Sequence, residues 1–87
     1  MGEGSVMVTF KIMPEGVETD IESLQKEIEE KINPSKLKVV PIAFGLKSLL
    51  VVKVIPERDG EMERVEKQIK SISGVKEVEV TNVARSW

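Results

Sequence analysis

Hydrophobic and polar residues alternate with a period of two at the start of the chain. Residues 6–13 place their apolar side chains on one face, which carries Val6, Val8, Phe10 and Ile12. Because successive side chains of a strand point to opposite sides of a sheet, this pattern predicts a strand with one buried face. Pro14 and Gly16 follow it and indicate a turn.

A helical period appears in two later segments. Residues 21–32 and residues 62–72 both repeat their apolar side chains every three or four positions, which predicts two amphipathic helices with one apolar stripe each. The first helix also has a start signal. Thr19 and Glu22 are spaced as a capping box, and Asp20 is a second candidate cap.

Three more strand-like runs complete the pattern, over residues 37–42, 46–55 and 75–83. Pro41 lacks a backbone donor, so the second strand is expected at an edge of the sheet. The order strand, helix, strand, strand, helix, strand predicts an α+β fold of the ferredoxin-like βαββαβ type. We expect a single domain over residues 1–87, with a four-stranded antiparallel sheet in the order 4-1-3-2 and two helices on one face.

Two helices cover only one face of such a sheet, so the other face is predicted to be open. Leu50, Val52 and Val54 are expected to face the helices, together with the apolar side of the first strand. The open face is then expected to carry Met7, Thr9, Lys11, Met13, Lys47, Leu49, Val51 and Lys53. An apolar patch rimmed by lysines usually marks a contact surface for a different protein. The alternatives are self-association through this face and partial cover by the tail of the chain.

The composition argues against conventional catalysis. The 87-residue chain contains no cysteine and no histidine, and its glycines form no phosphate-binding loop. Thiolates, the usual transition-metal ligands and the commonest general base are therefore missing. We expect that the chain has no metal site, binds no cofactor and is not an enzyme. The lack of cysteine fits a reducing compartment. With no apolar run of about 20 residues and no signal peptide, a cytoplasmic protein without membrane contact is expected.

Charge is distributed unevenly, although the net charge is only −2. Residues 35–56 contain no acidic residue but four lysines, which are Lys36, Lys38, Lys47 and Lys53. A locally basic surface suits an acidic protein partner or phosphate groups. Direct binding of nucleic acid is not expected, because the open face would carry no aromatic side chain on which bases could stack.

The connection between the second and third strands, Pro41 to Lys47, is unusual for a turn. Gly45 supplies the conformational freedom that a turn needs, but its neighbour Phe44 is large and apolar. An aromatic residue at a turn either packs inward as a plug or reaches outward as an anchor. Both alternatives are open for Phe44, and Lys47 is either a contact residue or an ordinary surface lysine.

Four segments of the chain, taken in order, resemble the archaeal elongation factor 1-beta family. They are Val6 to Pro14, the helix start Asp20-Ile21-x-x-Leu24, Pro41 to Lys47, and Ser73 to Val83. The segment Pro-Ile-Ala-Phe-Gly-Leu-Lys is the most specific of them, and the resemblance extends over the whole chain. It implies a ferredoxin-like guanine nucleotide exchange domain that acts on elongation factor 1-alpha, the GTPase that carries aminoacyl-tRNA.

The same resemblance implies which residues contact that GTPase. Phe44 would be an apolar wedge, and Lys47 would steer the chain towards acidic surface. In eukaryotic relatives a lysine at the C-terminus is thought to intrude on the Mg²⁺ site, whereas here Arg85 is the one cation in the tail from 84 to 87. The candidate contact residues are Phe44, Gly45, Lys47, Lys11, Lys53, Leu49 and Arg85. The chain alone is expected to be a monomer that binds the GTPase in its GDP-bound or nucleotide-free form.

Two other classes of protein share this topology. A regulatory or protein-interaction module would self-associate or bind a small ligand through the open face, and Gly16 is a candidate for a ligand loop after the first strand. An enzyme of the acylphosphatase type would need an arginine in a phosphate loop near the first strand. Residues 5–19 contain no arginine, which argues against that enzyme.

Overall fold

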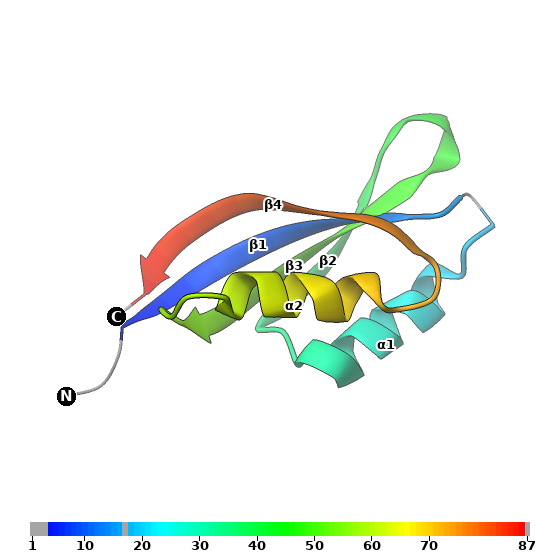
Figure 1. Ribbon diagram of the computed structural model, residues 1–87. Helices are drawn as coiled ribbons and strands as arrows, with labels where there is room; N and C mark the ends of the chain where they lie inside the picture. The colour runs from blue at the N-terminus through cyan, green and yellow to red at the C-terminus, as the bar shows by residue number, and fades with distance from the viewer. Residues whose placement is uncertain (1–3, 17, 87) are drawn as a thin grey trace.

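The computed structural model describes residues 4–16 and 18–86 and shows the predicted order of elements (Figure 1). The strands and helices are β1 (Ser5–Pro14), α1 (Ile21–Ile32), β2 (Lys36–Pro41), β3 (Lys47–Pro56), α2 (Glu61–Lys70) and β4 (Val75–Ser86). A short turn, η1 (Ala43–Gly45), joins β2 to β3. The four strands pair antiparallel in the order β2-β3-β1-β4, which confirms the ferredoxin-like fold.

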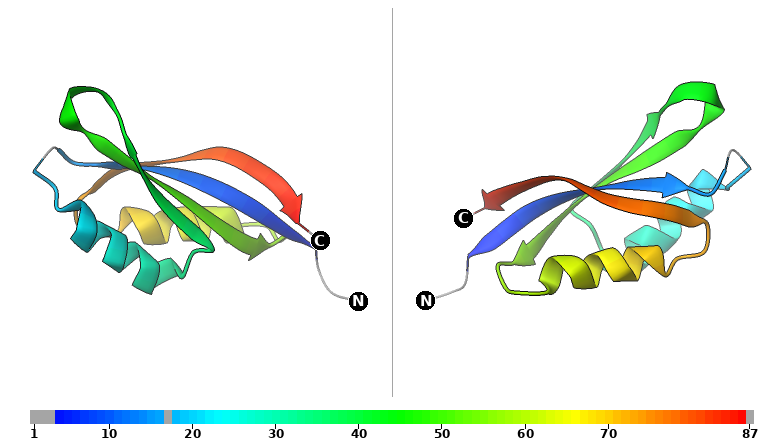
Figure 2. Two further views of the ribbon diagram at one scale, coloured as in Figure 1. Left: turned by 180° about the vertical axis from the view of Figure 1, so that it is seen from behind. Right: turned by 45° about the horizontal axis from the view of Figure 1, so that its top comes forward.

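Both helices pack on the same face of the sheet (Figures 1 and 2). The core between the two layers consists of Val6, Val8, Phe10, Ile12, Leu24, Ile28, Ile32, Leu49, Val51, Ile55, Val65, Ile69 and Ile72. The predicted apolar stripes of both helices and the predicted buried face of β1 are therefore confirmed. In the part of the chain that the structure describes, neither helix is long and apolar enough to cross a membrane.

The prediction of which β3 residues face the helices is wrong, because the two faces of the strand are exchanged. Leu49 and Val51 are completely buried against the helices. The face of β3 that points away from the helices carries Leu50, Val52 and Val54. The pairing explains this result, because Phe10 of β1 lies opposite Val51 and cross-strand partners point to the same face. Since β3 is apolar on both faces, its sequence has no alternation from which the buried face could be read.

Helix α1 is capped by Asp20, and the predicted capping box of Thr19 and Glu22 does not form. The Asp20 carboxylate accepts hydrogen bonds from the backbone N–H groups of Glu22 (3.1 Å) and Ser23 (3.3 Å). It also accepts one from the Ser23 hydroxyl at 3.0 Å, and this bond is the main reason that the pKa of Asp20 lies below its ordinary value. The Thr19 hydroxyl instead accepts a hydrogen bond from the backbone N–H of Gly16 at 3.2 Å.

Asp20→Ala is expected to lower the melting temperature at neutral pH, because first-turn N–H groups of α1 lose their acceptor. This difference should shrink in acid. A carboxyl group whose pKa is lowered by folding stabilises the fold above its unfolded-state pKa, and the stabilisation is lost as the pH falls through the folded-state value. Thermal unfolding of both proteins from about pH 7 to about pH 2 measures the difference.

Asp59→Ala is the matched control for this experiment. Asp59 precedes α2, whose N-cap residue is Gly60 and provides no side-chain capping hydrogen bond. We therefore expect Asp59→Ala to change the melting temperature only slightly. A difference between wild type and Asp20→Ala that stays constant down to the lowest pH would contradict the prediction.

Candidate functional site at the tip of the hairpin

Strands β2 and β3 form a hairpin that extends beyond the helices (Figures 1 and 2). Their pairing runs from Lys36 opposite Val52 to Pro41 opposite Lys47, and β2 lies at the edge of the sheet as predicted. The molecule is elongated, with principal extents of 47 × 21 × 17 Å, and the hairpin projects from one end. The turn between the two strands is therefore accessible to another macromolecule.

The tip is a tight turn with two successive residues at positive φ. The backbone N–H of Ile42 donates to the carbonyl oxygen of Leu46 at 2.8 Å, and the N–H of Leu46 donates to the carbonyl oxygen of Ala43 at 3.3 Å. Phe44 has φ 62° and ψ 31°, and Gly45 has φ 76°. Positive φ at both central residues is the signature of a type I′ turn, whose twist matches that of the paired strands.

Phe44 has a backbone conformation that glycine and asparagine tolerate much better than phenylalanine. The left-handed region costs a residue of this kind roughly 1–2 kcal/mol. The Phe44 residue is also 94% exposed, so packing within the chain does not offset that cost. The plug alternative is therefore wrong. An exposed aromatic side chain on a strained backbone is unfavourable for folding, and such residues are common at functional sites.

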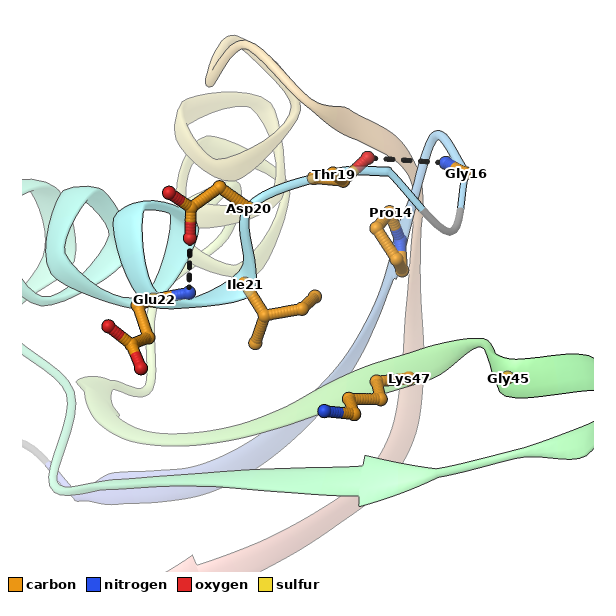
Figure 3. Close-up of a pocket in the computed structure, with 8 residues that line it drawn as sticks. All are labelled: Pro14, Gly16, Thr19, Asp20, Ile21, Glu22, Gly45 and Lys47. Atoms are coloured by element: carbon orange, nitrogen blue, oxygen red, sulfur yellow. Dashed lines mark hydrogen bonds between the residues drawn. The ribbon is translucent and has the colours of Figure 1, made fainter.

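A polar cavity of about 320 Å³ lies between the hairpin and the start of α1 (Figure 3). The cavity is lined by Pro14, Gly16, Thr19, Asp20, Ile21, Glu22, Gly45 and Lys47. Figure 3 shows Lys47 on β3, Glu22 on the first turn of α1, and the N-cap residue Asp20 directly before that turn. The cavity thus combines one cationic and two acidic side chains, and it can accept a polar group that donates and accepts hydrogen bonds.

Lys47 and Lys53 lie on the helix side of the sheet, so their predicted position on the open face is wrong. Both share the face of β3 that is buried at its centre, and Lys53 lies opposite the buried Val8. Lys53 is half-buried and borders a cavity of about 290 Å³ between the end of α1 and α2. Lys36 and Lys38 project from the other side of the sheet, so the predicted lysine cluster is divided between two faces.

The other two contact candidates from the sheet, Leu49 and Lys11, differ in their accessibility to a partner. Leu49 is 0% exposed, so its predicted exposure is wrong and its side chain is not available to a partner. Lys11 lies on the open face as predicted. It is flanked there by Leu50 of β3 and Glu79 of β4.

Arg85 lies far from the hairpin tip. It is set opposite Val6 of β1, and Val6 in turn lies opposite Ile55 of β3. Along β3, the eight residue steps from Lys47 to Ile55 span about 26 Å at about 3.3 Å per step. The Nε atom of Arg85 is 3.2 Å from Oε2 of Glu57 in an exposed ion pair. The structure therefore separates Arg85 from Lys47 at the tip, whereas Lys53 lies only two residues along β3 from Ile55.

Two features of the hairpin were not predicted from the sequence. The left-handed conformation of Phe44 had one local signal, because a residue followed by glycine between two strands is typical of a type I′ turn. The second feature is Ser48, which is buried and whose hydroxyl donates to the carbonyl oxygen of Val40 at 3.3 Å. This bond ties β3 to β2 near the turn, and no pattern in the sequence indicates it.

The chemistry available at the tip is that of a contact surface. Within residues 4–16 and 18–86, no group of three or more histidine, cysteine or acidic side chains is placed to hold a metal ion. The tip presents one aromatic ring, and the cavity beneath it presents charged side chains. This combination suits recognition by apolar burial and charge complementarity.

Comparison with known proteins finds one family over almost the whole chain. The EF-1 guanine nucleotide exchange domain matches residues 7–85. A relative from Methanothermobacter thermautotrophicus, named elongation factor 1-beta, is 42% identical over 86 residues, which cover 94% of this chain and 97% of the relative. Relatives of the same name from Aeropyrum pernix and Metallosphaera sedula are 43% and 42% identical over 86 residues, covering 92% of this chain and 94% and 93% of the relatives. The resemblance seen in the sequence motifs is confirmed.

Phe44→Asn is expected to increase the free energy of unfolding by roughly 1 kcal/mol, because asparagine tolerates the left-handed conformation and the exposed ring makes no buried contact to lose. Urea denaturation measures the change. Phe10→Ala is the contrasting control, since Phe10 is completely buried and its truncation should cost about 3–5 kcal/mol. A loss of several kcal/mol in Phe44→Asn would show that the ring packs against the fold.

Proposed function

The chain belongs to the elongation factor 1-beta family, and on this premise we propose that it promotes the exchange of GDP for GTP on elongation factor 1-alpha. The observation that carries the proposal for this chain is the tip of its hairpin. There the most specific motif of the family resemblance presents an aromatic residue that is 94% exposed, on a strained turn. Such a residue is suited to binding another protein.

An exchange factor acts through linkage and needs no nucleophile or base of its own. If it binds the nucleotide-free GTPase more tightly than the nucleotide-bound form, it weakens nucleotide binding by the same factor. A GTPase holds GDP through its phosphate loop and Mg²⁺. A contact that disturbs either one speeds the release of GDP, after which GTP can bind. This activity is compatible with a chain that contains no histidine and no cysteine.

We assign the apolar contact to Phe44. Burial of a phenylalanine side chain contributes about 1.5–3 kcal/mol, and nearly all of this residue is exposed in the free chain. The turn is already closed by two backbone hydrogen bonds, so little conformational entropy is lost when the tip is bound. The contact promotes exchange only if the pocket that receives the ring is better formed in the nucleotide-free GTPase.

Charged residues provide further candidate contacts. Lys47 borders the polar cavity beneath the tip and suits an acidic surface of the GTPase. Arg85 lies towards the other end of the sheet, so a partner that contacts both must extend along much of the 47 Å length of the molecule. Binding through Arg85 would exchange its contact with Glu57 for one with the partner. Because that ion pair is exposed, breaking it costs little.

Phe44→Ala is expected to slow factor-stimulated release of GDP by at least about tenfold, because truncation of a central aromatic anchor typically costs about 2 kcal/mol or more. The assay follows fluorescent GDP leaving elongation factor 1-alpha at limiting concentrations of the factor. Val54→Ala is the matched control, since Val54 is a partly exposed apolar residue away from the tip. It should retain the rate of the unmodified chain.

Two outcomes of this assay separate the function from the assignment of the residue. No acceleration by the unmodified chain at micromolar concentration would overturn the proposed exchange activity. If the unmodified chain accelerates GDP release, and Phe44→Ala and Val54→Ala accelerate it equally, only the role of Phe44 would be overturned.

Lys47→Glu is expected to slow association with the GTPase several-fold at low ionic strength, because charge near an interface steers encounter. The difference should diminish at about 1 M salt, where the screening length falls to about 3 Å. Lys36→Glu makes the same change in net charge at a position on β2 away from the tip. Equal slowing by both substitutions would show that total charge matters and that the position of Lys47 does not.

A further inference from the structure

Both helices lie on one side of the sheet, which leaves its other face open (Figures 1 and 2). The two central strands contribute Met7, Thr9, Lys11, Met13, Leu50, Val52 and Val54 to this face. Met7 and Val54 lie opposite each other, and each is 39% exposed. Contiguous apolar side chains that meet water on one face of a small domain commonly mark an interaction surface.

The two edge strands give the open face opposite charges on its two sides. One row across the sheet, in the order β2-β3-β1-β4, consists of Lys38, Leu50, Lys11 and Glu79. Cross-strand partners point to the same face, so Lys38 borders the open face on one side and Glu79 borders it on the other. Lys36 continues the basic edge along β2, and Glu77 continues the acidic edge along β4.

This arrangement is complementary to a second copy of itself. A two-fold axis parallel to the strands, midway between two facing sheets, places β2 of one copy over β4 of the other at the same level along the strands. Lys38 of each copy then faces Glu79 of the other, Lys11 faces Leu50, and Met7 faces Val54. Aligned sheets about 10 Å apart pack in this way in β-sandwiches. We propose that the chain forms a face-to-face homodimer through its open sheet face.

The size of the face predicts a weak dimer. Four strands about 4.8 Å apart, with about six residues each at about 3.3 Å, present about 400 Å² per copy. Stable protein interfaces bury about 800 Å² per partner. The dimer is therefore expected to dissociate at micromolar to millimolar concentrations, and dilute solutions contain the monomer that the sequence predicts.

The proposed dimer leaves the hairpin turn outside the contact. The row of Lys38 and Glu79 crosses the body of the sheet, whereas Phe44 lies beyond the last strand pair of the hairpin, Pro41 with Lys47. A two-fold axis parallel to the strands directs both hairpins the same way. Self-association therefore leaves the contact assigned to Phe44 accessible, although it covers Lys11. Either proposal can fail without the other.

Sedimentation equilibrium of the full chain from about 10 μM to about 1 mM tests the dimer. The average mass is expected to rise above the 9.7 kDa of the monomer as the concentration increases. Val54→Lys places a charge on the open face and should raise the dissociation constant at least about tenfold. Val83→Lys is the matched control, because Val83 is 47% exposed but lies opposite the core residue Val8 and shares its face.

Monomer mass over the whole concentration range would overturn the proposal. Equal weakening by Val54→Lys and Val83→Lys would also overturn it, because the effect would then not depend on the open face. Weakening by Val54→Lys alone supports it. Melting curves followed by circular dichroism show that each variant is folded under the conditions of the measurement.

Charge reversal tests the two-fold arrangement itself. Lys38→Glu and Glu79→Lys are each expected to weaken self-association at least about fivefold, because each homodimer then contains two like-charge contacts. In a mixture of the two variants, the heterodimer regains both opposite-charge contacts and should associate about as tightly as the unmodified chain. A mixture that associates no more tightly than the single variants would overturn the arrangement. If Lys38→Glu and Glu79→Lys slow nucleotide exchange but leave self-association unchanged, the open face would be assigned to the GTPase and the dimer would be overturned.

Discussion

The register of β3 against β1 decides which side chains of the sheet are buried. It sets Phe10 opposite Val51, and both are completely buried beneath the helices. Because the side-chain period of a strand is two, a slip by one residue would exchange the two faces of β3. The position of Lys47 near the start of α1 and the position of Leu50 on the open face both follow from this pairing.

The hairpin tip departs from the conformation and composition that folding alone favours. A type I′ turn is best served by asparagine and glycine, yet Phe44 precedes Gly45 with φ 62° and leaves its ring in water. Strain and exposure thus fall on the same residue, while the hydrogen bond from Ser48 to Val40 holds the strands together beneath it. Residues that lower stability in the free protein are a common consequence of selection for recognition.

The two surfaces considered for binding use different physical principles and share one strand. At the tip, a single ring on a rigid turn provides a localised apolar contact. On the open face, Leu50 and Val52 lie between a basic edge and an acidic edge, so recognition there depends on the symmetry of the partner as much as on apolar area. Strand β3 can serve both because it is apolar on two faces. One face completes the core and the other remains at the surface.

The sequence by itself determined the order of elements, the stripes of both helices, the buried face of β1, the strand order and the family, because these depend on local periodicity and short motifs. Only the tertiary structure decided which face of β3 is buried, because a strand that is apolar on both faces has no period to read. It also decided that Phe44 is exposed and that Arg85 lies far from it. Those outcomes depend on how far the hairpin extends past the helices and on strand register, which are set by contacts between residues distant in the chain.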